Sequence, residues 1–290
     1  LSYTDAFFEA MSGVTTTGST VITGLDTAPP GILLWRALLQ WLGGIGIIVM
    51  AISILPLLQV GGMQLFRMES SDSSDKAFPR VAQISAATAI IYVVLTLICA
   101  IAMWTAGMTP FEAAAHSMTT IATGGFSTSD ASIGHFDSAY MDWIVIIFMI
   151  LGSLPFVLYF AMIRGNPRAL VRDTQVQWFL ITVVVSIIMI AVWLVTKNDM
   201  AMWHAVRLSS FNVVSIITGT GYASADYNAW GVLPVTAFFF FMFIGGCAGS
   251  TSCGIKIFRY QILFANARVQ FRRMWQPNVV YSPRYNHKPI

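Results

Sequence analysis

The sequence predicts an all-α membrane protein made of repeated helical units, and three observations support this fold class. Hydrophobic residues make up 56% of the 290 residues and charged residues only 10%, whereas a soluble domain typically carries about 25% charged residues. Long apolar runs recur along the whole chain. Three short elements rich in threonine and glycine lie in the gaps between these runs.

Most of the apolar runs approach the roughly 20 residues that a helix needs to cross a bilayer, and they are too many for a signal peptide. Because the chain opens on Leu1 and enters a helical pattern at once, we expect it to be a fragment of a longer protein. The runs fall at about 32–58, 81–104, 141–163, 176–195 and 232–244.

The basic residues predict the orientation of these helices. All of the 16 Lys and Arg residues except Arg36, Lys197 and Arg207 lie in three segments, which the positive-inside rule places in the cytoplasm. The net charge of +3 therefore follows from topology and does not indicate nucleic-acid binding. The segments hold Arg67, Lys76 and Arg80; Arg164, Arg168 and Arg172; and Lys256, Arg259, Arg268, Arg272, Arg273, Arg284 and Lys288.

The Thr/Gly elements then open to the outside, where most acidic residues also lie. Negative charge at a mouth concentrates cations, although acids that merely avoid the inner loops would be distributed in the same way. The acids on the outer half are Asp5, Glu9, Asp26, Glu112, Asp130, Asp137, Asp142, Asp199 and Asp226.

The first unit begins with a short helix at about 4–14, for which Ser2 and Asp5 give a weak start signal. A polar loop follows at about 15–30, and then a spanning helix at about 32–58. We expect the opening span of this unit to precede Leu1.

The second unit has a span at about 81–105, a short helix at about 110–121 and a second span at about 138–163. Thr109, Pro110 and Glu112 place a hydroxyl at the N-cap, proline at N1 and glutamate at N3, which is the capping-box pattern of a helix start.

The third unit has a span at about 176–195, a short helix at about 200–217 that Asn198 and Asp199 are expected to cap, and a long segment from Trp230. The domain boundaries that follow are 1–66, 67–165 and 166–272 for the three repeats. Residues 273–290 are then a cytoplasmic linker toward a missing fourth repeat.

The short helices are too short to span a bilayer, and each runs into a Thr/Gly element. A helix C-terminus carries about −0.5 elementary charge, so three such ends aimed at one axis favour a cation there. One short helix alone is as well explained as an interfacial element. Three in the same position favour repeated helix, pore helix, filter loop and helix units around a central pore.

Small-residue pairs recur in the second half of each unit, at Gly43-Gly44, Gly152-Ser153 and Gly245-Gly246. Small residues let transmembrane helices approach closely. Tight helix packing alone and a shared pore axis both fit this pattern.

The Thr/Gly elements repeat one pattern, a hydroxyl residue followed six places later by a glycine: Ser12 to Gly18, Thr119 to Gly125 and Ser215 to Gly221. At membrane depth, irregular backbone is tolerated only where it packs in protein or lines a water-filled path, and ion filters use such backbone carbonyls. The candidate K⁺ ligands are Thr16, Thr17, Gly18, Thr123, Gly124, Gly125, Gly219, Thr220 and Gly221.

The elements hold neither a carboxylate nor Lys or Arg, which argues against both a calcium-type acidic ring and an anion pore. Phe126 and Tyr222 follow the second and third glycines and are expected to pack as a cuff behind the loops. The first element has Ser19 there, so the filter is not symmetric.

The sequence does not favour an enzyme, because it has no paired carboxylates within a span, no nucleophile elbow and no metal-binding histidine pattern. His116 and His204 lie on short helices and are interpreted as packing or interfacial residues rather than proton relays. The three cysteines indicate neither a metal site nor a disulfide framework.

A Gly-rich break at 245–254 interrupts the last long segment. Each glycine costs about 1 kcal/mol in a helix relative to alanine. A simple kink explains the break, and so does a mobile flap that gates flow beneath the filter. The candidate gating residues are Gly245, Gly246, Gly249, Ser250, Thr251, Ser252, Gly254 and Lys256.

Three stretches carry a resemblance to a known family: FEAMSGVTTTGS at 8–19, TTIATGGFST at 119–128 and GGCAGSTSCGIK at 245–256. With them, essentially the whole chain resembles the TrkH/TrkG/KtrB superfamily of potassium-uptake membrane subunits, and most closely its TrkH branch. Two departures stand out: the fourth repeat is absent, and Cys253 stands where the family usually has glycine.

The resemblance implies four pore-lining repeats with one glycine per filter loop, and a gating loop at 245–254. It also implies a homodimer in the bacterial inner membrane, in contact with lipid. A cytoplasmic TrkA-like subunit that binds nucleotide (NAD(H) or ATP/ADP) would regulate it. The expected function is channel-like K⁺ uptake. A Na⁺- or H⁺-coupled symporter and a non-conducting ion-binding scaffold are the alternatives.

Overall fold

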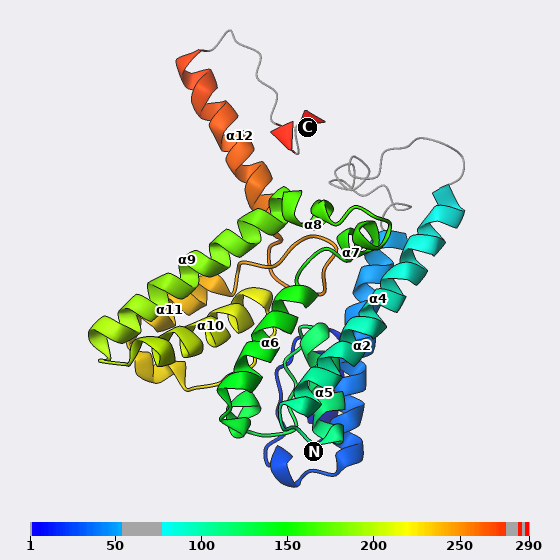
Figure 1. Cartoon of the computed structure of the whole chain (residues 1–290), viewed down its shortest axis with the longest axis vertical. Coiled ribbons are helices and arrows are strands. Elements are labelled where there is room, and N and C mark those ends of the chain that lie inside the picture. The colour runs from blue at the N-terminus through cyan, green and yellow to red at the C-terminus, as the bar shows by residue number, and fades with distance from the viewer. Residues whose placement is uncertain (1, 54–76, 277–283, 286–287, 290) are drawn as a thin grey trace.

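The computed structural model describes residues 2–53, 77–276, 284–285 and 288–289 of the chain. Nearly all regular structure within them is helical, as the sequence predicts (Figure 1). The strands found there, β1 (Arg284–Tyr285) and β2 (Lys288–Pro289), hold two residues each and pair antiparallel. The protein has an all-α membrane fold.

The first unit comprises α1 (Tyr3–Val14), the single turn η1 (Leu25–Thr27) and α2 (Pro30–Ser53). The start of α1 is a complete capping box: the Ser2 hydroxyl accepts from the Asp5 amide at 3.2 Å, and the Asp5 carboxylate accepts from the Ser2 amide at 3.0 Å. The expected end of the second span, 54–58, lies outside the described residues, as do Arg67, Lys76 and the boundary at 66.

The second unit comprises α4 (Ala77–Thr105), α5 (Pro110–Ile121), the 3₁₀ turn η2 (Ser132–Phe136), α6 (Ala139–Gly152) and α7 (Phe156–Ile163). The predicted capping box of α5 is confirmed. Thr109 Oγ1 accepts from the Glu112 amide at 3.3 Å, and Glu112 Oε2 accepts from the Thr109 amide at 2.8 Å.

The span expected at 138–163 is not one straight helix. α6 and α7 are separate helices that meet at 90°. Pro155 lies in the break and cannot donate to a continuing helix. The carbonyls freed there accept elsewhere: Ser153 O from the Cys247 amide at 3.0 Å, and Gly152 O from the Thr251 amide at 3.2 Å.

The third unit comprises α8 (Arg168–Arg172), which the sequence did not predict, α9 (Thr174–Lys197), α10 (Met202–Thr218), η3 (Tyr227–Trp230), α11 (Val232–Phe241) and α12 (Ile257–Trp275). The apolar run at 232–244 yields only the ten-residue helix α11, which is too short to span alone.

The predicted cap of the third short helix is wrong. Neither Asn198 nor Asp199 caps α10, whose N-cap is Ala201 and has no side-chain hydrogen bond. Asp199 instead takes a left-handed backbone conformation with φ 50°, which turns the chain between α9 and α10.

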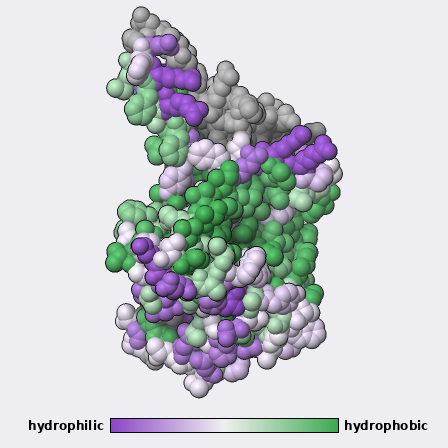
Figure 2. Space-filling model, turned by 60° about the vertical axis from the view of Figure 1, so that its left-hand side comes forward, coloured by the Kyte–Doolittle hydropathy of each residue, from purple (hydrophilic) through white to green (hydrophobic). Residues whose placement is uncertain are grey.

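By length and composition, α4 over Gln83–Thr105 and α9 can each cross a membrane, and the bent pair α6 and α7 counts as a third if it is one broken span. Figure 2 shows a hydrophobic band between more hydrophilic ends. On α9, apolar side chains such as Ile181, Val185 and Ile188 are exposed, as expected where lipid is the solvent.

The helices pack so that the short helices of the second and third units, α5 and α10, lie inside. α5 packs against α2, α4 and α6, while α10 packs against α6 and α9 (Figure 1). Tyr92, Phe156, Phe179 and Phe211 are among the largest fully buried side chains. This packing brings together the loops that follow α1, α5 and α10.

Candidate functional site: three loops at the ends of the short helices

The three Thr/Gly elements form loops of the same backbone shape, which we name loop 1 (15–19), loop 2 (122–126) and loop 3 (218–222). Two positions in each loop are left-handed, which only glycine adopts readily. The first of these positions has φ values of 55° at Thr16, 50° at Thr123 and 73° at Gly219, and the second has values of 78° at Gly18, 81° at Gly125 and 82° at Gly221.

The hydroxyl residue of each pattern also contributes its backbone carbonyl to a bond with the loop. The carbonyl of the hydroxyl residue, in the last turns of each short helix, accepts from an amide in the loop that follows. The bonds are Thr17 N to Ser12 O at 3.0 Å, Gly124 N to Thr119 O at 2.9 Å and Gly221 N to Ser215 O at 3.2 Å. Each loop is thereby closed onto the helix before it.

The hydroxyls brace loops 1 and 3 as well. Ser12 Oγ donates to Ser19 O at 2.6 Å, and Ser215 Oγ donates to Tyr222 O at 2.6 Å. Both bonds hold the residue that follows the left-handed glycine. The pattern read in the sequence is therefore a repeated helix-to-loop clamp.

The loops lie side by side in chain order. A Cβ added to Gly18 would lie 1.9 Å from Gly124 O in loop 2, and one added to Gly125 would lie 1.9 Å from Thr220 O in loop 3. A side chain at either glycine would therefore collide with the next loop. The corresponding direction from Gly221 is open, and no heavy atom of the described residues lies within 4 Å of an added Cβ.

The structure thus brings the nine predicted ligand residues into three neighbouring loops whose polar groups are all uncharged. Among the described residues, no cluster of three or more His, Cys, Asp or Glu side chains is placed to hold a metal ion. The oxygens that these loops can offer a cation are backbone carbonyls and threonine hydroxyls.

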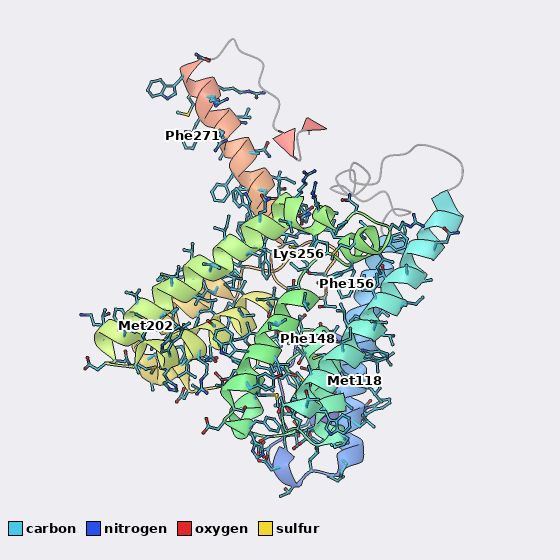
Figure 3. The ribbon with its side chains drawn as sticks, in the orientation of Figure 1. Met118, Phe148, Phe156, Met202, Lys256 and Phe271 are labelled. Atoms are coloured by element: carbon cyan, nitrogen blue, oxygen red, sulfur yellow. The ribbon has the colours of Figure 1, made fainter. Side chains whose placement is uncertain are left out.

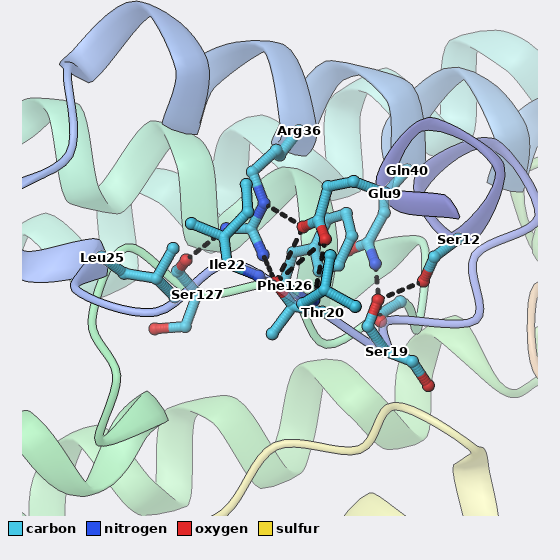
Figure 4. Close-up of polar contacts among 12 residues, drawn as sticks. Glu9, Ser12, Ser19, Thr20, Ile22, Leu25, Arg36, Gln40, Phe126 and Ser127 are labelled. Atoms are coloured by element: carbon cyan, nitrogen blue, oxygen red, sulfur yellow. Dashed lines mark hydrogen bonds and ion pairs between the residues drawn. The ribbon is translucent and has the colours of Figure 1, made fainter. Parts of the chain in front are cut away.

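A buried ion pair that the sequence did not predict lies behind loops 1 and 2 (Figure 4). Arg36 Nε from α2 donates to Glu9 Oε1 from α1 at 2.7 Å, and both side chains are less than 10% exposed. The Arg36 guanidinium also donates to Thr20 Oγ1 and to Ser127 O, each at 3.1 Å. One side chain thus joins the segments that follow both loops. The signal in the sequence was a lone arginine within an apolar run.

The aromatic residues that end loops 2 and 3, Phe126 and Tyr222, are buried, as the predicted cuff requires. Phe126 packs against Arg36, whose guanidinium carbon lies 4.0 Å from the ring centroid. The Tyr222 hydroxyl contacts Thr119 and donates to His116 O at 3.3 Å, so it ties loop 3 to α5.

His116 has the packing role that the sequence indicated. It is fully buried, and its ring nitrogens lie 2.9 Å from Glu112 O and 2.9 Å from Ser127 Oγ.

Several acids expected at the outer mouth have structural partners instead. Glu9 is paired with Arg36, and Asp142 lies 3.5 Å from Arg207 at 7% side-chain exposure. Asp5 and Glu112 serve as capping residues. These four acids therefore have structural roles, whether or not the outer acids also attract cations.

The segment 245–254 is not helical and docks beneath the loops. Thr251 Oγ1 lies 2.9 Å from both Ile121 O, at the end of α5, and Gly152 O, at the end of α6. Cys253 Sγ lies 3.8 Å from Gly219 O in loop 3. Lys256, at the foot of α12 in Figure 3, donates to Ser252 O and Oγ.

The small-residue pairs give the close approach that the sequence predicted. A Cβ on Gly43 would lie 2.0 Å from Val14 O at the end of α1, and one on Gly152 would lie 3.0 Å from Ile121 O at the end of α5. Gly245 is different, since its nearest neighbour is Cys253 O within its own segment.

Comparisons with known proteins agree with this architecture. Residues 1–288 match the TrkH family, described as cation transport protein. The chain is 48% identical over 291 residues to the Trk system potassium uptake protein TrkI of Halomonas elongata and 41% identical over 296 residues to TrkH of Salmonella typhimurium. It is fully covered in both alignments but spans only 59% and 61% of those proteins.

A solved structure is also similar. The crystal structure of the potassium transporter TrkH from Vibrio parahaemolyticus superposes with a TM-score of 0.90 at 38% identity, covering 100% of this chain and 60% of that one. The all-α membrane architecture is thus shared with an experimentally determined fold.

Proposed function

Because the chain belongs to the TrkH family of cation transport proteins, we propose that it forms part of a K⁺ uptake pore in which loops 1, 2 and 3 are sides of the selectivity filter. The observation that carries this proposal is the side-by-side arrangement of three loops with the same pair of left-handed positions. Three equivalent loops around one axis provide matching sets of oxygen ligands at the same depth.

The uncharged character of the loops supports K⁺ as the ion. A filter conducts when its ligands replace the hydration shell of the ion without holding it too tightly. Neutral carbonyl and hydroxyl oxygens from the nine candidate residues meet this requirement. The relatives TrkI and TrkH are potassium uptake proteins, and K⁺ is accordingly the transported ion that we propose here.

The open side of Gly221 supports a pore with more sides than this chain supplies. We assign the repeats to 1–66, 67–165 and 166–272, with 273–290 as the linker toward a fourth. A fourth loop beside Gly221 would complete the ring, and the chain spans about 60% of the relatives that it matches.

The segment 245–254 is the proposed gate. It lies under loops 2 and 3 and holds four glycines. Hydrogen bonds of Cys247, Gly249 and Thr251 fix it to the break between α6 and α7, and the Ala248 amide donates to Gln175 of α9. Opening of the gate requires that these hydrogen bonds break.

The finer assignments concern location and partners. We propose a multi-pass protein of the bacterial inner membrane that is a homodimer and is regulated by a cytoplasmic TrkA-like nucleotide-binding subunit. The exposed basic and aromatic residues of α12, such as Arg259, Phe271 and Trp275, are consistent with a protein or lipid contact. Co-purification with such a subunit, with and without nucleotide, tests the partner.

The transport proposal is tested by uptake of radioactive Rb⁺ or K⁺ into bacteria that lack other K⁺ uptake systems and express the full-length protein containing this chain. Uptake is expected, and its absence with the protein present in the membrane would favour the non-conducting scaffold. Loss of uptake when the Na⁺ or H⁺ gradient is dissipated at constant membrane potential would favour a symporter.

A further inference from the structure

Loop 2 departs from loops 1 and 3 at two positions. In loop 1 the hydroxyls of Thr15 and Thr17 lie 2.8 Å apart, and in loop 3 those of Thr218 and Thr220 also lie 2.8 Å apart. The equivalent residues of loop 2 are Ala122 and Gly124, which have no hydroxyl. Loop 2 therefore lacks the brace that the other two loops build from their own residues.

Gln40 of α2 reaches the site where this brace is missing (Figure 4). Gln40 is completely buried. Nε2 donates to Gly124 O at 2.7 Å, and Oε1 accepts from the Phe126 amide at 3.0 Å. The two hydrogen bonds span Gly125, the left-handed glycine of loop 2.

The space beside Gly124 is filled by the same side chain. A Cβ added to Gly124 would lie 2.4 Å from Gln40 Cδ, and its three nearest atoms all belong to Gln40. Gly124 is not among the residues with positive φ, so its backbone does not require glycine. The first glycine of the Gly124-Gly125 pair is explained by Gln40, not by backbone conformation.

The side-chain amide of Gln40 offers a donor and an acceptor on two separate atoms at the same end. A methionine of similar length offers no N–H donor, and a carboxylate offers no donor when ionised. Losing both bonds would leave buried polar backbone groups of loop 2 without this partner, which is costly in an apolar interior.

We propose that Gln40 is a positioning residue of the filter, which fixes the 124–126 segment and thereby sets the preference for K⁺ over Na⁺. It replaces, from a neighbouring repeat, the threonine pairs of loops 1 and 3. The inference rests on the proposed function, because it assigns a role within the same filter.

The test is Gln40→Met in the full-length protein, with radioactive Rb⁺ uptake measured in competition with unlabelled K⁺ and Na⁺. The ratio of the two inhibition constants is expected to fall about tenfold while uptake persists, since two buried hydrogen bonds are lost. This ratio does not depend on how much protein reaches the membrane. Gln177→Met on α9, whose amide donates to Val171 O, is the matched control and should keep the wild-type ratio.

An unchanged ratio in Gln40→Met would overturn the inference and leave the proposed function standing. A wild-type protein without uptake would instead contradict the proposed function itself. The two failures are therefore distinguishable in one series of measurements.

A second comparison covers the case in which Gln40→Met does not reach the membrane. Gly124→Ala should lower the ratio in the wild type, because its Cβ meets Gln40, and should do less harm in a Gln40→Ala background, where the space is free. Equal effects of Gly124→Ala in both backgrounds would show that Gln40 does not set the position of loop 2.

Discussion

At the scale of single residues, the uncharged loops depend on charged and polar side chains behind them. The Glu9–Arg36 pair is buried between α1 and α2 and reaches the segments after loops 1 and 2. A buried ion pair is costly to desolvate, but removing one partner costs more, because it leaves the other charge unpaired. The network therefore fixes the loops only while both charges are present.

Arg36→Met should lower the free energy of unfolding by roughly 3–5 kcal/mol, because it leaves the Glu9 carboxylate buried without its partner. The midpoint of thermal unfolding of the full-length protein in detergent measures this loss. The double variant Arg36→Met/Glu9→Gln should recover part of it. A double variant that unfolds no later than the single one would contradict the pairing.

Gly125→Ser should weaken K⁺ over Na⁺ discrimination, because Gly125 has φ 81° and an added Cβ would lie 1.9 Å from Thr220 O. Competition of Na⁺ with radioactive Rb⁺ uptake measures the change. Gly107→Ser is the matched control: Gly107 is also left-handed, with φ 116°, but has nothing within 4 Å of an added Cβ. If both variants keep the wild-type selectivity, loop 2 does not belong to the filter.

At the scale of elements, two breaks in helical structure are hydrogen-bonded to each other. The break between α6 and α7 frees the Gly152 and Ser153 carbonyls, and residues 245–254 supply the donors that bind them. The same segment also contacts the C-terminal end of α5 through Thr251. A helix break in one repeat thus provides the docking site for a helix break in the next.

Thr251→Val should raise the uptake that persists without activating partners by several-fold, since the hydroxyl that contacts Ile121 O and Gly152 O is lost. Rb⁺ efflux from liposomes containing the purified full-length protein measures it. Thr251→Ser keeps the hydroxyl and should behave as the wild type. Removing part of 245–254 should have a larger effect on flux. Unaltered flux in Thr251→Val and in the deletion variant would show that the segment is a simple kink and not a gate.

At the scale of the whole molecule, hydrophilic residues gather at the two ends of a hydrophobic band (Figure 2). α12 extends away from the body at the end opposite the N-terminus (Figure 1). This polarity agrees with the orientation that the positive-inside rule predicts.

A cysteine placed at exposed Asp226 should react with a membrane-impermeant maleimide added to intact cells. One placed at exposed Arg168 should react only after the cells are opened. Native cysteines are replaced first, because Cys253 is exposed. Labelling of Arg168→Cys in intact cells would reverse the predicted orientation.

The sequence by itself determined the features that depend on near neighbours along the chain. Composition gave the membrane class, Ser2 and Thr109 marked helix starts, and the hydroxyl-to-glycine spacing located three loops that the structure shows to be alike. These patterns are local, since a cap or a helix-to-loop clamp is closed within about seven residues.

Only the tertiary structure decided which distant side chains support those loops. Gln40 binds Gly124 across 84 positions, and Arg36 reaches Ser127 across 91. The bend at Pro155 likewise depends on partners near 247–251 that satisfy its free carbonyls. Such contacts leave no periodic trace in the sequence, because their energy comes from burying polar groups with partners that the fold brings together.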